Sequence, residues 1–397
     1  MEKIYDITVA GHICLDIIPE FPDTGIREIS ALFKPGKLIR VEGAKISTGG
    51  PVSNTGIALS KLGLNVAFMA RVGDDYFGKL VIDLLNRQGY AAGISIAQSN
   101  RTSYSVAIAP PGIDRIFLHD SGANDFFSSA NLNEEIIHQS KIFHFGYPPI
   151  MATCYENEGA ELFQIFKIAK SAGVVTSLDM ALPDPNSDSG KTSWQKILTK
   201  VLPYVDIFLP SIEEVYFMLD QQKYFEIKEQ AGDSDIIEFI HPNDYQRLAQ
   251  KCLDMGCKIV ALKTAYRGYY ILTNKITSND IPVLSDSKNW SYRELWCPAF
   301  RVERIASATG SGDSSIAGFL AALVKGYPVE KVLKYANCVG HQNLHELDAV
   351  SGIKNWEETT ASLEQNKLEM IDMPLEKFGW QLNNDFKVWT SSRNKHF

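Results

Sequence analysis

Apolar runs alternate with amphipathic segments along most of the chain. A β-branched run at 4–11 predicts a buried first strand, and the pattern at 53–63 predicts a helix that ends near Gly63. Further strands are expected at 65–72, 141–146, 174–179 and 205–209, and further helices at 76–89, 157–172, 192–201 and 212–220. Strands and helices in alternation predict a parallel sheet with helices on both faces, which is a doubly wound α/β three-layer sandwich.

Two β-rich runs, 102–109 and 114–119, interrupt this alternation. Pro110-Pro111-Gly112-Ile113 separates them, which is typical of an antiparallel hairpin. The segment 17–45 is rich in proline and glycine and suits short strands and turns. We expect the hairpin and this segment to form a small β lid on the main domain.

The C-terminal half predicts a hairpin of strands 258–264 and 269–272 and helices at 312–325 and 329–346. Residues 221–243 are polar and weakly periodic and are expected to form an inserted loop, and 273–300 to form a second insertion. The predicted domains are an α/β core of 1–16, 46–100 and 121–365, a lid of 17–45 and 101–120, and a tail of 366–397 packed on the core.

Composition narrows the classes of function. The net charge of -8 argues against a nucleic-acid partner, because phosphates require a basic surface. The first eleven residues lack an apolar signal core and no run approaches the ~20 apolar residues of a membrane span, so we expect a cytoplasmic protein. Six scattered cysteines without CxxC pairs predict buried, reduced thiols.

One candidate site begins at Ala308-Thr-Gly-Ser-Gly-Asp313, which leads directly into an apolar helix. Gly310 and Gly312 allow the backbone to curl so that several N–H groups point at one place, at the positive end of the helix dipole. Such an anion hole suits a phosphoryl group in transfer, and Asp313 could accept a proton from an attacking hydroxyl. The structural alternative is an ordinary helix cap, since Asp and Gly are common there.

A second candidate segment is Gly49-Gly50-Pro-Val-Ser-Asn54, followed by Arg71-Val-Gly-Asp-Asp-Tyr-Phe-Gly78. Paired glycines let a ligand approach the backbone, and Asn54 can both donate to and accept from a hydroxyl. In order and spacing, the two segments together resemble the two signatures of the ribokinase-like (phosphofructokinase-B type) carbohydrate kinases. The resemblance covers roughly residues 4–355.

The resemblance implies a ribokinase-like fold and phosphorylation by ATP with Mg²⁺. It implies a homodimer through the lid, with a sugar and ATP as small-molecule partners. The residues that it marks are the base Asp313, the anion hole Gly310, Ser311 and Gly312, the acceptor-binding Asp16, Gly49, Gly50 and Asn54, the ATP-binding Lys263, Gly268 and Asn337, and Glu214 for magnesium.

Three positions depart from the family pattern. Ser307 stands where the family has an aspartate that helps to bind a monovalent cation, so little potassium activation is expected. Ser211 replaces the asparagine of the family's Asn-x-x-Glu magnesium motif, while Glu214 is present. Ala265 replaces the first glycine of the G-x-x-G nucleotide turn that ends at Gly268.

The function expected from these features is ATP-dependent phosphorylation of a hydroxyl group on a small sugar or sugar acid. Two alternatives stay open at this point: a nucleoside kinase of the same fold, and a non-catalytic sugar or nucleotide sensor. The segment Ser189-Gly190-Lys191-Thr192 ends like a P-loop, but Pro185 occupies the position of the leading glycine and no strand immediately precedes it.

Overall fold

The computed structural model describes residues 2–87, 93–113, 115–365 and 367–392. The strands of its main sheet are β1 (Tyr5–Gly11), β4 (Val66–Gly73), β5 (Ile94–Ala97), β8 (Ser140–Gly146), β9 (Val175–Leu178), β10 (Ile207–Phe208), β11 (Ile259–Lys263), β12 (Tyr269–Thr273), β13 (Glu294–Cys297), β14 (Trp380–Asn383) and β15 (Val388–Ser391). Their spatial order is β14-β15-β13-β12-β11-β10-β9-β8-β1-β4-β5. Neighbouring strands from β11 to β5 are parallel, whereas the pairs from β14 to β11 are antiparallel.

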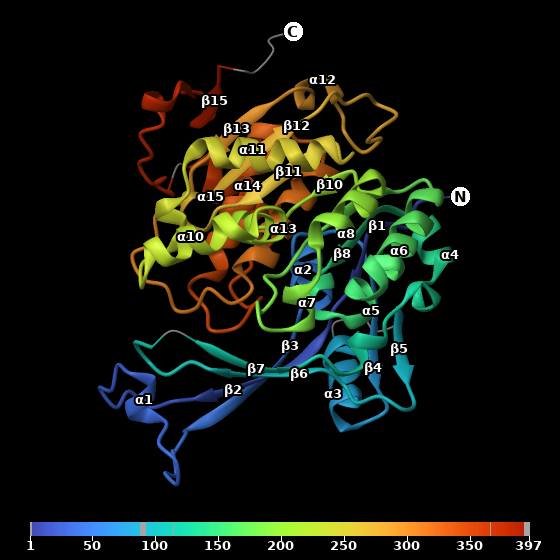
Figure 1. The fold of residues 1–397 in the computed structure, drawn as a ribbon. Coiled ribbons are helices and arrows are strands. Elements are labelled where there is room, and N and C mark those ends of the chain that lie inside the picture. Colours follow the sequence, from blue (N-terminus) through green and yellow to red (C-terminus); the bar gives the residue numbers. More distant parts are fainter. Residues whose placement is uncertain (1, 88–92, 114, 366, 393–397) are drawn as a thin grey trace.

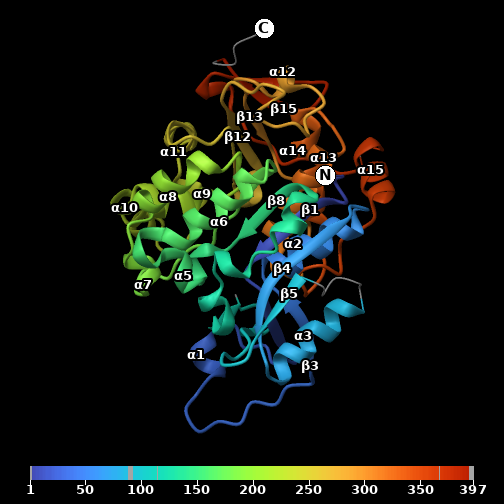
Figure 2. The same cartoon turned by 90° about the vertical axis from the view of Figure 1, so that its right-hand side faces the viewer.

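Helices cover both faces of this sheet, as Figures 1 and 2 show. One face carries α2 (Pro51–Lys61), α3 (Tyr76–Asn86), α13 (Ser311–Val324) and α14 (Val329–Asn343). The other carries α6 (Ala160–Ser171), α8 (Trp194–Val201), α9 (Ile212–Leu219), α10 (Gln221–Ala231) and α11 (Pro242–Asp254). Side chains alternate along each strand, so Ile142 packs into the first core and Phe143 into the second. The doubly wound α/β sandwich expected from the sequence is confirmed.

A second, four-stranded sheet extends from one end of the core (Figure 1). It contains β2 (Cys14–Glu20), β3 (Gly43–Gly49), β6 (Tyr104–Ile108) and β7 (Ile116–Asp120), in the order β3-β2-β6-β7. Strands β6 and β7 pair antiparallel, which confirms the predicted hairpin. We call this sheet the lid. Residue 114 of the hairpin and residues 88–89 of the expected second helix lie outside the described residues.

Two expectations about insertions were wrong. Residues 221–243 are not a loop, because α10, a 3₁₀ turn at Ile236–Phe239 and the start of α11 occupy them. Tyr224, Ile227 and Ala231 bury one face of α10, a narrow apolar stripe within a polar sequence. The segment 273–300 likewise holds β13, a strand of the main sheet, beside the short α12 (Ser287–Trp290).

The C-terminal segment also has regular structure, since α15 (Trp356–Glu364) is followed by the β14–β15 hairpin. Strand β15 pairs with β13, where Trp389 lies opposite Trp296. All six cysteines are free and buried, as the sequence predicts. Trp290 and Trp296 are buried in the core, which supports packing as their role. Among the described residues, no helix combines the length and apolarity needed to cross a membrane.

Candidate active site

The buried carboxylate of Asp313 is the centre of the site. Gly310 precedes α13 with a φ of 71°, a left-handed conformation that glycine adopts without strain, and this places Asp313 in the first turn of the helix. Asn54 of α2 donates from Nδ2 to Asp313 Oδ2 at 2.9 Å. The Thr55 hydroxyl lies 3.5 Å from the other oxygen, Oδ1. Residues far apart in sequence, in the two motifs found above, therefore meet at one carboxylate.

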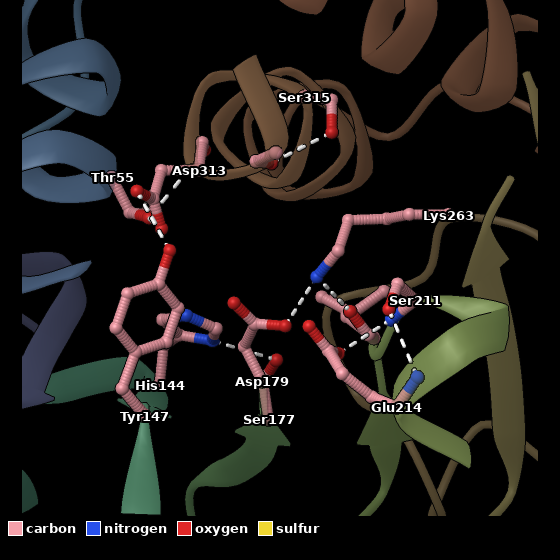
Figure 3. A network of polar contacts seen from close by, with 12 residues as sticks. Thr55, His144, Tyr147, Ser177, Asp179, Ser211, Glu214, Lys263, Asp313 and Ser315 are labelled. Atoms are coloured by element: carbon pink, nitrogen blue, oxygen red, sulfur yellow. Dashed lines mark hydrogen bonds and ion pairs between the residues drawn. The ribbon is translucent and has the colours of Figure 1, made fainter. Parts of the chain in front are cut away.

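Tyr147 is a site residue that sequence reasoning missed. It follows β8, and its hydroxyl donates to Asp313 Oδ2 at 3.1 Å (Figure 3). Its φ of 65° lies in the left-handed region, which costs a non-glycine residue on the order of 1–3 kcal/mol. The surrounding structure thus holds Tyr147 in an unfavourable backbone conformation with its hydroxyl on Asp313.

The two donors on Oδ2 leave Oδ1 as the oxygen with more capacity to accept a further hydroxyl. Burial raises the pKa of Asp313, whereas the hydrogen bonds from Asn54 and Tyr147 and the charge of Lys263 lower it. Burial and the neighbouring Asp313 carboxylate raise the pKa of Tyr147 well above its usual value, so the phenol keeps its proton and acts as a donor. The net effect is a raised pKa, which makes the ionised carboxylate a stronger proton acceptor than an ordinary aspartate.

Asp16 lies at the base of the lid, opposite Ser47 in the β2–β3 pair. A Cβ on Gly49 would stand 2.1 Å from Asp16 Oδ2, and one on Gly50 would stand 2.6 Å from His12 Nδ1. The two glycines are therefore required where the chain passes Asp16 and His12. Burial raises the pKa of Asp16 to about 6, with a contribution from the negative charge of Asp313, while the Cys14 thiol opposes the shift by donating a hydrogen bond at 3.3 Å.

His12 and His119 were also missed by sequence reasoning, and their rings lie 5.1 Å apart between the core and the lid. The Ser103 hydroxyl donates to the Asp120 carbonyl at 2.7 Å, so it accepts from His12 Nε2 at 3.4 Å. His12 Nδ1 is then a buried acceptor, with no hydrogen-bond partner among the residues that the structure describes. Burial keeps the pKa of His12 low, and the imidazole is neutral.

Lys263 ends β11, and its ammonium is paired with Asp179 and with the Leu209 carbonyl, the latter at 2.7 Å (Figure 3). Its Cδ lies 3.8 Å from where a Cβ on Gly312 would stand, so the lysine lies beside the first turn of α13. Burial would lower the pKa of Lys263, but the carboxylates of Asp179 and Glu214 outweigh it and raise the pKa. A fixed positive charge beside a helix N-terminus suits a phosphate group.

Glu214 forms a capping box with Ser211 at the start of α9. The Ser211 N–H donates to Glu214 Oε2 at 2.7 Å, and the Glu214 N–H donates to the Ser211 hydroxyl at 3.2 Å. The serine therefore preserves the helix start despite its departure from the family motif. No cluster of three or more His, Cys, Asp or Glu side chains in the described part of the chain could hold a metal ion. The Glu214 carboxylate is of the oxygen-ligand type that magnesium prefers.

Gly268 and Asn337 shape the neighbouring turn. Gly268 has a φ of 87°, and a Cβ there would lie 2.1 Å from the Cys297 carbonyl, so only glycine fits. Asn337 Nδ2 donates to the carbonyls of Cys297 and Pro298, both at 3.0 Å. Ala265 adopts a φ of 47°, a left-handed conformation that the family's glycine at this position would take more easily.

The anion-hole loop is held by internal hydrogen bonds. The Ser311 N–H donates to the Ala308 carbonyl at 3.2 Å, so this amide is engaged within the loop. The Ser314 N–H donates to the Gly310 carbonyl at 2.8 Å, whereas amides nearer a helix start, such as that of Gly312, generally lack an acceptor within the helix. Ser307 donates to the Thr309 hydroxyl at 2.9 Å and accepts from its N–H at 3.0 Å.

Comparisons with known proteins agree with this geometry. The model of the pfkB family carbohydrate kinases matches residues 7–356. A protein named probable fructokinase-3 from Arabidopsis thaliana is 22% identical over 378 residues, covering 93% of this chain and 94% of the relative. The structure of Arabidopsis thaliana ribokinase complexed with ribose and ATP superposes with a TM-score of 0.67 at 18% identity, over 92% of this chain and 99% of the other.

A fructokinase with bound ATP from Xylella fastidiosa gives the same TM-score of 0.67 at 16% identity, over 92% of this chain and 100% of that one. At these identities, the solved structures establish the fold. The family model covers most of the chain and includes both motifs that meet at Asp313. The chain therefore belongs to the pfkB family of carbohydrate kinases and is a sugar phosphotransferase.

Proposed function

We propose that this enzyme transfers the terminal phosphoryl group of ATP to a hydroxyl of a small sugar or sugar acid, with Asp313 as the base. The observation that carries the proposal is the buried Asp313 carboxylate, which lies at the N-terminus of α13 and accepts hydrogen bonds from Asn54 and Tyr147. A helix cap needs no such set of donors from two other elements. The arrangement fixes a proton acceptor beside a site for a phosphoryl group.

Each predicted residue then has a role. ATP would supply the phosphoryl group, and Mg²⁺ would neutralise charge on its oxygens. The amides of Gly310, Ser311 and Gly312 face the transferring group, although that of Ser311 must exchange its partner Ala308 to do so. Lys263 must likewise leave Asp179 in part to meet a phosphate oxygen. Glu214 would hold the magnesium ion, through its bound water.

The acceptor lies between Asp313 and the lid. Asp16, Gly49, Gly50 and Asn54 form its binding surface, with one carboxylate able to accept from neighbouring hydroxyls. Oδ1 of Asp313 takes the proton of the attacking hydroxyl, since Oδ2 already has two donors. Gly268 leaves room for the nucleotide at the turn after β11, and Asn337 supports that side of the site through the 297–298 backbone.

The direct test is a coupled assay of ADP release across a panel of sugars, sugar acids and nucleosides at fixed MgATP. Fructose and ribose head the panel because the named relatives are a fructokinase and a ribokinase complexed with ribose. We expect turnover with at least one sugar and a loss of at least ~10²-fold in kcat for Asp313→Asn, with folding and ATP binding retained. Turnover with nucleosides alone, or binding without turnover, would refute the assignment.

We also propose that two copies associate through the lid. Strand β7 lies at the edge of the lid and exposes Ile116, Phe117 and Leu118, with 43%, 45% and 55% of their surface accessible. An exposed apolar edge strand is a natural site for pairing with another chain. Phe117→Glu should convert a dimer to a monomer in light scattering, and a wild-type protein that is monomeric at micromolar concentration would contradict this.

A further inference from the structure

An ion pair connects the lid to the core close to the anion-hole loop. Lys45 of β3 contacts Oδ2 of Asp348, which lies in the segment after α14. The Lys45 side chain is 40% exposed, whereas that of Asp348 is only 4% exposed. The lid thus contributes a charge to a carboxylate that belongs to the interior of the core.

Asp348 is held in place by several donors besides Lys45. Its Oδ1 accepts from the N–H groups of Val350 at 2.9 Å and Ser351 at 2.6 Å, and its Oδ2 accepts from the Ser351 hydroxyl. Burial would raise the pKa of Asp348, but Lys45 and these donors hold it at about 2. The carboxylate is therefore ionised at neutral pH and stays hydrogen-bonded even without Lys45.

The residues beside Asp348 pack directly on the anion-hole loop. A Cβ on Gly310 would stand 2.4 Å from the Ala349 side chain, so the two backbones are in close contact. Asn343 Nδ2 donates to the Thr309 carbonyl at 2.8 Å and to the Asp348 carbonyl at 3.2 Å. Ser314, one residue after Asp313, donates to the Ala349 carbonyl at 3.3 Å. A shift of Asp348 would be transmitted to Gly310–Ser314.

The other end of the ion pair leads to the acceptor side. In the β2–β3 pair, Lys45 lies opposite Ile18, and Ser47 lies opposite Asp16. Lys45 and Asp16 are therefore on adjacent strands of one short ladder, and a strand pair moves as a unit because its backbone hydrogen bonds are shared. The ion pair therefore connects the β2–β3 pair, which carries Asp16, with the segment after α14, which supports the anion hole.

We propose that Lys45 and Asp348 are positioning residues, which fix the lid relative to the anion-hole loop and so align the acceptor hydroxyl with the phosphoryl group. This rests on the proposed function for its consequence in catalysis, but the mechanical link can be measured without it. Phosphoryl transfer depends chiefly on alignment, and a displacement of about 1 Å can cost on the order of 10²-fold in rate.

The test uses four variants of the full-length protein: Lys45→Met, Asp348→Asn, the double variant, and Lys45→Arg. Lys37→Met is the matched control, because it removes the same charge from an exposed position of the lid-side segment 21–42. Amide hydrogen exchange of peptides spanning 306–315 and 344–352 is measured without ligands, and kcat and both KM values are measured with the best acceptor of the panel.

We expect Lys45→Met to speed exchange in both segments by about threefold or more and to lower kcat by roughly tenfold, with a smaller change in the KM for ATP. Lys45→Arg should keep both the exchange rates and kcat close to the wild-type values, and Lys37→Met should match the wild type. The kcat of the double variant should be no lower than that of the less active single variant, since the two residues act through one contact.

Unchanged exchange at 306–315 together with unchanged kcat in Lys45→Met would overturn the proposal. A fall in kcat with unchanged exchange would also overturn it, because the link to the loop would then be missing. Exchange does not require turnover, so faster exchange in a protein that phosphorylates no member of the panel would support the link and would refute the proposed function separately.

Discussion

The hydroxyl of Tyr147 offers a sharp test of how Asp313 is tuned. Tyr147→Phe removes one oxygen and leaves the half-buried ring in place. The lost contact is a 3.1 Å hydrogen bond to an ionised carboxylate, and such bonds contribute about 1.5–3 kcal/mol. Because 1.36 kcal/mol corresponds to one pKa unit, the pKa of Asp313 should rise by roughly one to two units.

The sign of the effect on the pH profile follows from this shift. The hydrogen bond favours the charged carboxylate, so its loss leaves Asp313 protonated up to a higher pH. The acid limb of log(kcat/KM) against pH should therefore move upwards by about one to two units. Above this limb, activity should fall by less than about tenfold, because the base remains present and is intrinsically stronger.

The assay is steady-state ADP release between pH 5 and 9 in buffers of constant ionic strength. Tyr269→Phe is the control, since it removes the hydroxyl of a buried tyrosine that meets Ser315 at 2.7 Å instead of Asp313. Its acid limb should match that of the wild type. An acid limb unmoved in Tyr147→Phe, or moved equally in both variants, would show that Tyr147 does not tune Asp313.

Three further predictions concern the other predicted groups. Asp16→Ala should raise the KM for the acceptor about tenfold or more and leave the KM for ATP unchanged, as loss of a charge-assisted hydrogen bond implies. Asn54→Ala should in addition lower kcat, because Asn54 donates to Asp313. Normal kinetics in both variants would remove these residues from the site. Glu214→Gln should raise the magnesium concentration for half-maximal rate, which a metal titration measures; an unchanged curve would refute its role. Potassium at ~100 mM should raise the rate less than about threefold, equivalent to under roughly 0.7 kcal/mol, because Ser307 offers no charge to replace the cation's hydration. A tenfold higher rate in potassium than in tetramethylammonium would contradict this.

Sequence patterns predicted the parts of the site that depend on short motifs. The alternation of strands and helices gave the sheet and its two helical layers, and the glycines before Asp313 marked the start of α13. Both kinds of inference work because they rest on local backbone requirements and on periodic burial. The family resemblance marked Asn54 and Asp313 as site residues, but their direct hydrogen bond was not predicted, since no local pattern encodes a contact between such distant residues.

The residues that were missed share a different physical character. Tyr147 and Asp179 each follow directly on a buried strand, and their partners Asp313 and Lys263 belong to other elements. A polar residue at the carboxyl end of a parallel strand was the available signal. Helix α10 was not predicted because its apolar face is narrow. Strand β13 was not predicted because it is defined by its pairing with β12 and β15.

The pairing of β15 with β13 has a consequence for the fate of incomplete or clipped chains. Loss of residues after 379 would remove both β14 and β15 and leave β13 with an unpaired edge that contains the buried Leu295 and Trp296. An open, apolar edge strand is a template for adding strands from other molecules. Proteolysis near the described C-terminal residues should therefore produce aggregates before it produces an inactive but soluble enzyme, although Asp313 lies elsewhere in the fold.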